Sequence, residues 1–147
     1  MPAGVESSSG RRIIAWALRP PAGFAILLAM FSPAVLDHFE HPRNAGELPD
    51  ATTVLEVSNP VCGDILRLAV RMEGGRIAAA RFRTRGCVTS IACSSLLTEL
   101  VMGRSLAEIG EITADRIASE LGGLEPATHH AADLARDAVE ALIARSR

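Results

Sequence analysis

The sequence contains no lysine and no tyrosine, and only four phenylalanines and one tryptophan among its 147 residues. Without lysine, the chain has neither a Schiff-base nucleophile nor the lysine of a phosphate-binding P-loop. All 15 basic residues are arginines and are balanced by 17 acidic residues, so that the formal net charge is −2. This balance predicts no basic face of the kind that nucleic-acid binding requires.

Long apolar runs are also missing. Residues 13–18 and 24–28 are apolar, but Arg19-Pro20-Pro21 separates them, and neither approaches the roughly 20 residues of a transmembrane helix. A small-residue cleavage site typical of a signal peptide is absent as well. We therefore expect no membrane association and a cytoplasmic protein. Residues 1–29 are interpreted as a leader that is disordered or results from a misassigned start, with a targeting peptide as the alternative.

Cysteine is scarce, with three residues in the chain. An odd count disfavours the paired disulfides of a secreted scaffold and favours free thiols in a reducing compartment. Metal or sulfur chemistry is therefore the leading use for these thiols, and buried inert cysteines are the alternative. Apolar residues make up 48% of the chain, which is enough for a core built mainly from alanine, leucine, isoleucine and valine.

The pattern from residue 52 to residue 85 predicts an antiparallel meander. Thr52–Ser58 is rich in threonine and valine, and apolar residues alternate with Arg67, Ala69 and Arg71 in the segment that follows. Glu73-Gly74-Gly75-Arg76 is typical of a hairpin turn. In the third strand, residues 77–85, the alternation predicts one face formed by Ala78, Ala80 and Phe82.

Helix signals flank this meander. Ser32 followed by Pro33 is typical of a helix start, and Ser105 with Glu108 matches a capping box. Further helices are expected after Thr89 or Ser90 as the cap, after Thr113, and from about His129 to the end. Strands followed by helices predict an α+β fold in two layers, a three-stranded antiparallel sheet packed against about five helices.

Three residues with metal-binding side chains fall at positions that this topology brings together. Cys62 and Asp64 lie in the predicted turn between the first two strands, and Cys87 follows the third strand. In a three-stranded meander these two points share one end of the sheet. His130, at the start of the last helix, is the expected fourth ligand. Thiolate, imidazole and carboxylate together suit zinc or iron–sulfur chemistry.

Two further residues are auxiliary candidates. Cys93 follows Cys87 by six residues, and six steps of about 100° on a helix direct it away from the first cysteine. Cys93 is therefore interpreted as a packing residue in preference to a metal ligand. His129 is interpreted either as an auxiliary residue beside His130 or as an exposed residue at the start of a helix.

Several segments, in order, resemble the U-type iron–sulfur cluster assembly scaffold family, the group that includes IscU, the NifU N-terminal domain and SufU. The resemblance runs from Met30 to the end of the chain, residues 30–147. It is carried by the opening helix and His41-Pro42-Arg43-Asn44 loop, by Asn59-Pro60-Val61-Cys62-Gly63-Asp64, by Arg81-Phe82-Arg83-Thr84-Arg85-Gly86-Cys87 and by Leu134-Ala135-Arg136-Asp137-Ala138.

The resemblance implies a scaffold and not an enzyme. Such a protein receives sulfur from a cysteine desulfurase, receives iron, builds a labile [2Fe–2S]-type cluster and transfers it to apo-proteins. It also implies that Cys62, Cys87 and His130 bind iron or the cluster and that Asp64 favours release, with zinc as the alternative metal.

Two positions depart from the family pattern. Ala131 stands where the family has a third cysteine that takes the incoming sulfur, so the usual sulfur route is not expected. Residues 124–128 differ from the segment that binds the family's specialised chaperone, and docking of that chaperone is not expected either. Two alternatives therefore remain: a zinc-bearing sulfur relay for a desulfurase, and a degenerate member that acts only as a binding partner.

Overall fold

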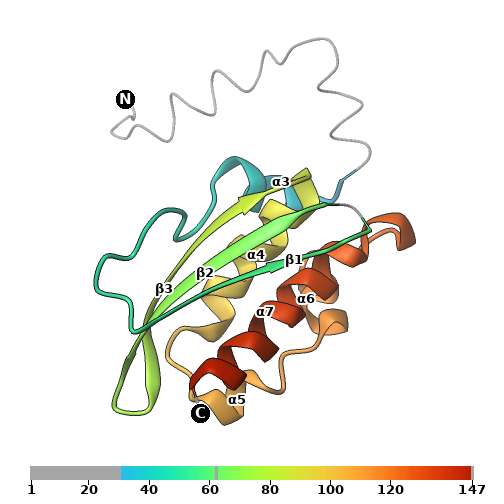
Figure 1. Ribbon diagram of the computed structural model, residues 1–147. Coiled ribbons are helices and arrows are strands. Elements are labelled where there is room, and N and C mark those ends of the chain that lie inside the picture. Colours follow the sequence, from blue (N-terminus) through green and yellow to red (C-terminus); the bar gives the residue numbers. More distant parts are fainter. Residues whose placement is uncertain (1–30, 62, 147) are drawn as a thin grey trace, which may run out of the picture. The chain divides into compact units, whose positions relative to one another are not determined.

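The computed structural model describes residues 31–61 and 63–146. The predicted boundary between residues 29 and 30, and Cys62, lie outside the described residues. Strands β1 (Thr53–Ser58), β2 (Ile65–Glu73) and β3 (Arg76–Arg85) form one antiparallel sheet in the order β1-β2-β3. The predicted meander is confirmed (Figure 1).

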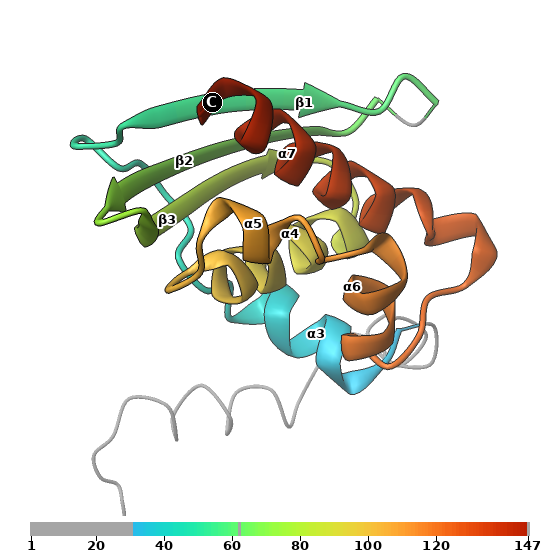
Figure 2. The same cartoon turned by 90° about the horizontal axis from the view of Figure 1, so that it is seen from below.

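Five α-helices are found in the described part of the chain, together with one short 3-10 helix. They are α3 (Pro33–Glu40), α4 (Val88–Val101), α5 (Leu106–Ile109), α6 (Ala114–Glu120), η1 (Pro126–Thr128) and α7 (His130–Ser146). All of them lie on one face of the sheet (Figure 2). This arrangement confirms the predicted α+β fold. None of these helices is long and apolar enough to cross a lipid bilayer.

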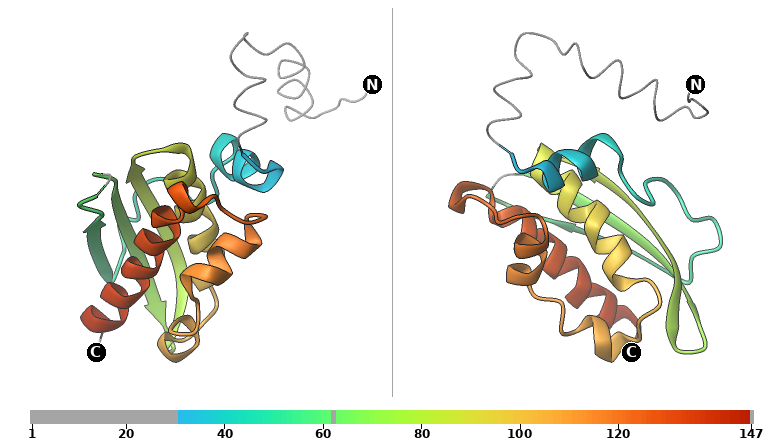
Figure 3. Two further views of the ribbon diagram at one scale, coloured as in Figure 1. Left: turned by 90° about the vertical axis from the view of Figure 1, so that its right-hand side faces the viewer. Right: turned by 180° about the vertical axis from the view of Figure 1, so that it is seen from behind.

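The core lies between the sheet and the two longest helices, α4 and α7 (Figure 3). Leu55, Leu68 and Phe82 stand opposite one another on the three strands, and all three are buried. From the helices, Leu97 and Leu142 are completely buried. Burying such side chains stabilises the fold by roughly 1.5–3 kcal/mol each, so this layer holds α4 and α7 against the sheet.

Local capping signals set where several helices begin. Ser32 caps α3 by accepting a hydrogen bond from the Val35 amide, with Pro33 in the first turn. Ser105 and Glu108 form the predicted reciprocal capping box at α5. Because these caps satisfy amides that would otherwise lack a partner within the helix, the sequence correctly predicted these starts.

Two details of the prediction were wrong. Ala78 is exposed, because the register shifts between Arg71 and Met72 so that Ala79 pairs with Arg71 and Ile77 pairs with Met72. This β-bulge reverses the alternation and turns Ile77 inward instead. The cap of α4 is neither Thr89 nor Ser90: the helix begins one residue after Cys87, which is its N-cap.

Candidate metal centre

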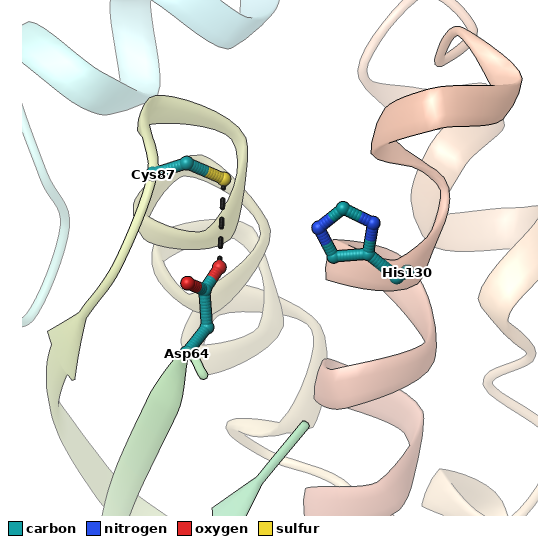
Figure 4. A group of neighbouring side chains, drawn as sticks. All are labelled: Asp64, Cys87 and His130. Carbon is teal, nitrogen blue, oxygen red and sulfur yellow. Dashed lines mark hydrogen bonds between the residues drawn. The ribbon is translucent and has the colours of Figure 1, made fainter. Parts of the chain in front are cut away.

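Asp64, Cys87 and His130 converge at one end of the sheet (Figure 4). One ligand atom from each, a carboxylate oxygen, a thiol sulfur and an imidazole nitrogen, lies within 4.8 Å of the other two. It is the single group of three metal-binding side chains within residues 31–61 and 63–146. In a tetrahedral zinc site, sulfur and nitrogen ligands are about 3.5 Å apart, so small side-chain rotations would bring these atoms to ligand spacing.

Asp64 reaches the site from the turn between β1 and β2. Gly63 has a positive φ of 77°, a backbone conformation that favours glycine. Its amide donates to the carbonyl of Asn59 at 2.7 Å, and the Asn59 amide donates to the carbonyl of Asp64 at 2.9 Å. This short turn directs the buried Asp64 side chain toward the end of β3, where the three residues meet.

Cys87 comes from the junction of β3 and α4. Its Sγ accepts a hydrogen bond from the amide of Ser90 at 3.4 Å, which is the N-cap interaction of the helix. The sulfur therefore lies at the end of α4 where the helix dipole favours negative charge. The residue is exposed, so its thiol is accessible from solvent.

The carboxylate of Asp64 lies directly against the backbone of Gly86. A Cβ atom at position 86 would lie 2.5 Å from Cγ of Asp64 and 2.7 Å from its Oδ1, far inside van der Waals contact. Only glycine at position 86 therefore leaves Asp64 beside Cys87. Sequence reasoning missed this role, although the Gly86-Cys87 pair at the end of a predicted strand is the signal for it.

His130 is the first residue of α7 and is half-buried. Its ring faces Cys87 and Asp64 across the gap between α7 and α4 (Figure 4). Ala131, which stands where the family pattern has a third cysteine, is 1% exposed and its side chain offers no ligand atom. The three candidate ligands thus come from the turn between β1 and β2, from the N-cap of α4 and from the first residue of α7.

The two auxiliary candidates lie in different surroundings. Cys93 is fully buried within α4, and this burial raises the pKa of its thiol to about 12. Nε2 of His129 lies 3.4 Å from Oδ1 of Asp115, and its Nδ1 lies 3.8 Å from Oδ1 of Asp133. His129 therefore contacts acidic side chains instead of joining the group of three.

Fold and site together define a class: a small α+β domain with a mixed cysteine, carboxylate and histidine centre at one end of a three-stranded sheet. The family described as NifU-like N terminal domain matches residues 30–146. The chain belongs to this family.

Two curated relatives support the assignment. The chain is 42% identical over 114 residues to the iron-sulfur cluster assembly scaffold protein IscU 1 of Archaeoglobus fulgidus, covering 78% of this chain and 74% of that protein. It is 39% identical over 124 residues to the iron-sulfur cluster assembly enzyme IscU of Drosophila melanogaster, covering 82% and 80%.

Among solved structures, the fold is similar to that of a nitrogen-fixing NifU-like protein (N-terminal) from Brucella abortus. The TM-score is 0.54 at 20% identity, over 82% of this chain and 84% of that one. At this identity the likeness concerns the fold alone.

Proposed function

We propose that this chain is a scaffold for iron–sulfur cluster assembly, which builds a labile [2Fe–2S]-type cluster and passes it to apo-proteins. The observation that carries the proposal is the convergence of Asp64, Cys87 and His130 from three separate elements. Relatives that share about two fifths of its residues are named for cluster assembly, and one of them is named a scaffold, which supports the same role.

The proposed ligands of the cluster or its iron are Cys62, Asp64, Cys87 and His130. Cys62 precedes Asp64 by two residues in the sequence. Oxygen and nitrogen donors bind iron–sulfur centres less firmly than thiolates do, because thiolate is the ligand that these clusters prefer. A mixed ligand set therefore suits a protein that must release its cluster.

The iron and the sulfide are cargo in this proposal, and the chain changes no covalent bond of a separate substrate. We accordingly infer a scaffold and not an enzyme. The proposed partners are a cysteine desulfurase as the sulfur source and apo-proteins as acceptors. The ligand thiols must stay reduced, which requires a reducing compartment. We propose that this compartment is the cytoplasm. The scaffold domain is proposed to span residues 30–147.

Anaerobic reconstitution tests the proposal. The protein is incubated with ferrous iron, cysteine, a cysteine desulfurase and a dithiol reductant, which reduces the persulfide sulfur to sulfide. Its visible absorption, iron and acid-labile sulfide are then measured. We expect a coloured product that contains iron and sulfide, and its loss in Cys62→Ala and in Cys87→Ala. The matched control is Cys93→Ala, which removes a buried thiol outside the ligand group and should still yield the coloured product.

Other outcomes would point to the alternatives. A colourless protein that carries zinc and a persulfide would favour the sulfur relay. A folded protein that binds neither iron nor zinc above trace would favour a binding partner without a metal. Either outcome would overturn the scaffold proposal.

A further inference from the structure

Ser90, in the first turn of α4, contacts two of the candidate ligands at once. Its hydroxyl donates a hydrogen bond to Oδ2 of Asp64. The same Oγ lies 3.3 Å from Sγ of Cys87, and the Ser90 amide donates to that sulfur at 3.4 Å. Ser90 is 1% exposed, so water does not compete for these contacts.

The usual hydrogen bonding of serine within a helix does not explain where the Ser90 hydroxyl points. Buried serines within helices often donate to the carbonyl four residues earlier, and Ser94 does so here, to the Ser90 carbonyl at 2.8 Å. Ser90 lies in the first turn of α4, three residues after the N-cap, and its hydroxyl is directed out of the helix to the carboxylate. The hydrogen bond therefore joins α4 to the turn that carries Asp64.

The hydrogen bond to Asp64 is compatible with metal binding. Sγ of Cys87 also lies 3.5 Å from Oδ2, with the thiol as donor, but a cysteine loses its proton when it binds a metal. The Ser90 hydroxyl keeps its proton, so its bond to Oδ2 persists. An ionised carboxylate has two oxygens with about four acceptor sites in total, so Asp64 can accept from Ser90 and still bind an ion.

We propose that Ser90 is a positioning residue of the metal centre. Its hydroxyl holds the carboxylate of Asp64, and its amide holds the sulfur of Cys87, so that one residue sets the spacing of an oxygen and a sulfur ligand. This inference rests on the proposed function, since it concerns the same site. Hydrogen bonds that orient ligands in this way typically change metal affinity by about 10- to 100-fold.

Anaerobic titration with Co²⁺ tests the role of Ser90. Cobalt reports its ligands through visible absorption and its affinity through the titration curve. We expect Ser90→Ala to bind Co²⁺ about 10- to 100-fold more weakly. Its sulfur-to-cobalt absorption should remain, because the backbone amide of residue 90 still contacts Cys87. Ser90→Thr keeps the hydroxyl and should restore the affinity toward that of the wild type.

The matched control is Ser95→Ala. Ser95 is equally buried in the same helix, but its Oγ lies 2.8 Å from Nδ1 of His38 and accepts a hydrogen bond from the Arg43 amide at 2.8 Å, away from the ligands. Thermal unfolding of the metal-free variants reports stability separately. We expect Ser95→Ala to lower stability and to leave the Co²⁺ affinity unchanged.

The outcomes separate the two proposals. If wild type binds Co²⁺ and Ser90→Ala binds it equally well, the role of Ser90 is overturned while the metal centre stands. An equal loss of affinity in Ser95→Ala would assign the effect to helix stability and would overturn it too. A folded wild-type protein that binds no Co²⁺ would overturn the metal centre itself.

Discussion

Sγ of Cys87 lies 3.5 Å from Oδ2 of Asp64, although the two residues are 23 positions apart in the sequence. The contact joins the turn between β1 and β2 to the start of α4. It exists because β3 is antiparallel to β2 and pairs Arg85 with Ile65, which brings the residues that follow β3 beside the residues that precede β2. The two candidate ligands are thus fixed by the register of the sheet.

Replacing Gly86 with alanine should disrupt this contact. The added Cβ would lie 2.5 Å from Cγ of Asp64, so the carboxylate must move or β3 must shift. Overpacking of this kind typically costs about 1–3 kcal/mol. We expect Gly86→Ala to lower the free energy of unfolding by that amount and to weaken Co²⁺ binding, measured by urea unfolding and by anaerobic titration.

Gly110→Ala is the control for this substitution. A Cβ at position 110 would have its nearest neighbour, the Ala107 carbonyl oxygen, at 3.4 Å, and the φ of Gly110 is −60°, which any residue adopts. This variant should retain its stability and metal affinity. If Gly86→Ala bound cobalt as tightly as the wild type does, the packing of Asp64 against Gly86 would not be what positions the Asp64 carboxylate for metal binding.

Neighbouring histidines provide a second test of the site. His130 contributes its imidazole to the group of three, whereas His129 contacts Asp115. His130→Ala should weaken Co²⁺ binding by at least about tenfold, since even the loss of a supporting residue has that effect. His129→Ala should leave the affinity unchanged. Equal effects of the two substitutions in the cobalt titration would contradict the assignment of His130.

The third test concerns the sulfur acceptor. The thiolate is the reactive form of cysteine, and burial raises the pKa of Cys93 to about 12, so this thiol is almost wholly protonated and shielded at neutral pH. Ala131 has no thiol. After reaction with a desulfurase, we expect the persulfide on Cys62 or Cys87 and none on Cys93, as mapped by mass spectrometry of peptides.

Cys93→Ala completes this test. The substitution should leave the persulfide yield unchanged and lower the stability by about 1–2 kcal/mol, because it leaves a small cavity in a packed helix. A persulfide found mainly on Cys93, or a yield that collapses in this variant, would identify Cys93 as a relay despite its burial.

The sequence predicted those parts of the site that depend on topology. The alternation of apolar residues defined a meander, and a meander brings Asp64 and Cys87 to the same end of the sheet. Strong caps such as Ser105 and Thr113 were correctly predicted, because their side chains accept hydrogen bonds from amides three residues later. Those signals are local and are contained within a few residues.

The details that were missed depend on contacts between elements. The bulge at Ala78 escaped prediction because three successive alanines, Ala78–Ala80, give no contrast between the two faces of the strand. Cys87 was overlooked as a cap because serine and threonine are the usual N-cap residues. The bond from Ser90 to Asp64 depends on how α4 meets the β1–β2 turn, which no local pattern specifies.

A last prediction concerns pH and His38. This side chain is buried between α3 and α4, with Nδ1 2.8 Å from Oγ of Ser95 and Nε2 3.8 Å from Oε1 of Glu99. Burial, assisted by the positive charge of Arg43, lowers the pKa of His38, whereas Glu99 and Asp37 act in the opposite direction and are outweighed.

The sign of the effect on stability follows from proton binding. Below the unfolded-state pKa, about 6.5, the unfolded chain binds more protons at this position than the folded chain does. The contribution of His38 to stability is therefore fully present above that pH and is lost as the pH falls through it. We expect the free energy of unfolding, measured in urea, to decrease from about pH 7.5 to about pH 5.5.

His38→Asn isolates this contribution, because an asparagine amide can replace Nδ1 in the hydrogen bond to Ser95 and does not titrate. The variant should lose less stability than the wild type over the same interval. His41→Asn, at an exposed position just after α3, is the control and should keep the wild-type slope. If the stability of the wild type stayed constant or rose as the pH fell, this would contradict the assignment of the pH dependence to a His38 that is buried and neutral in the folded state.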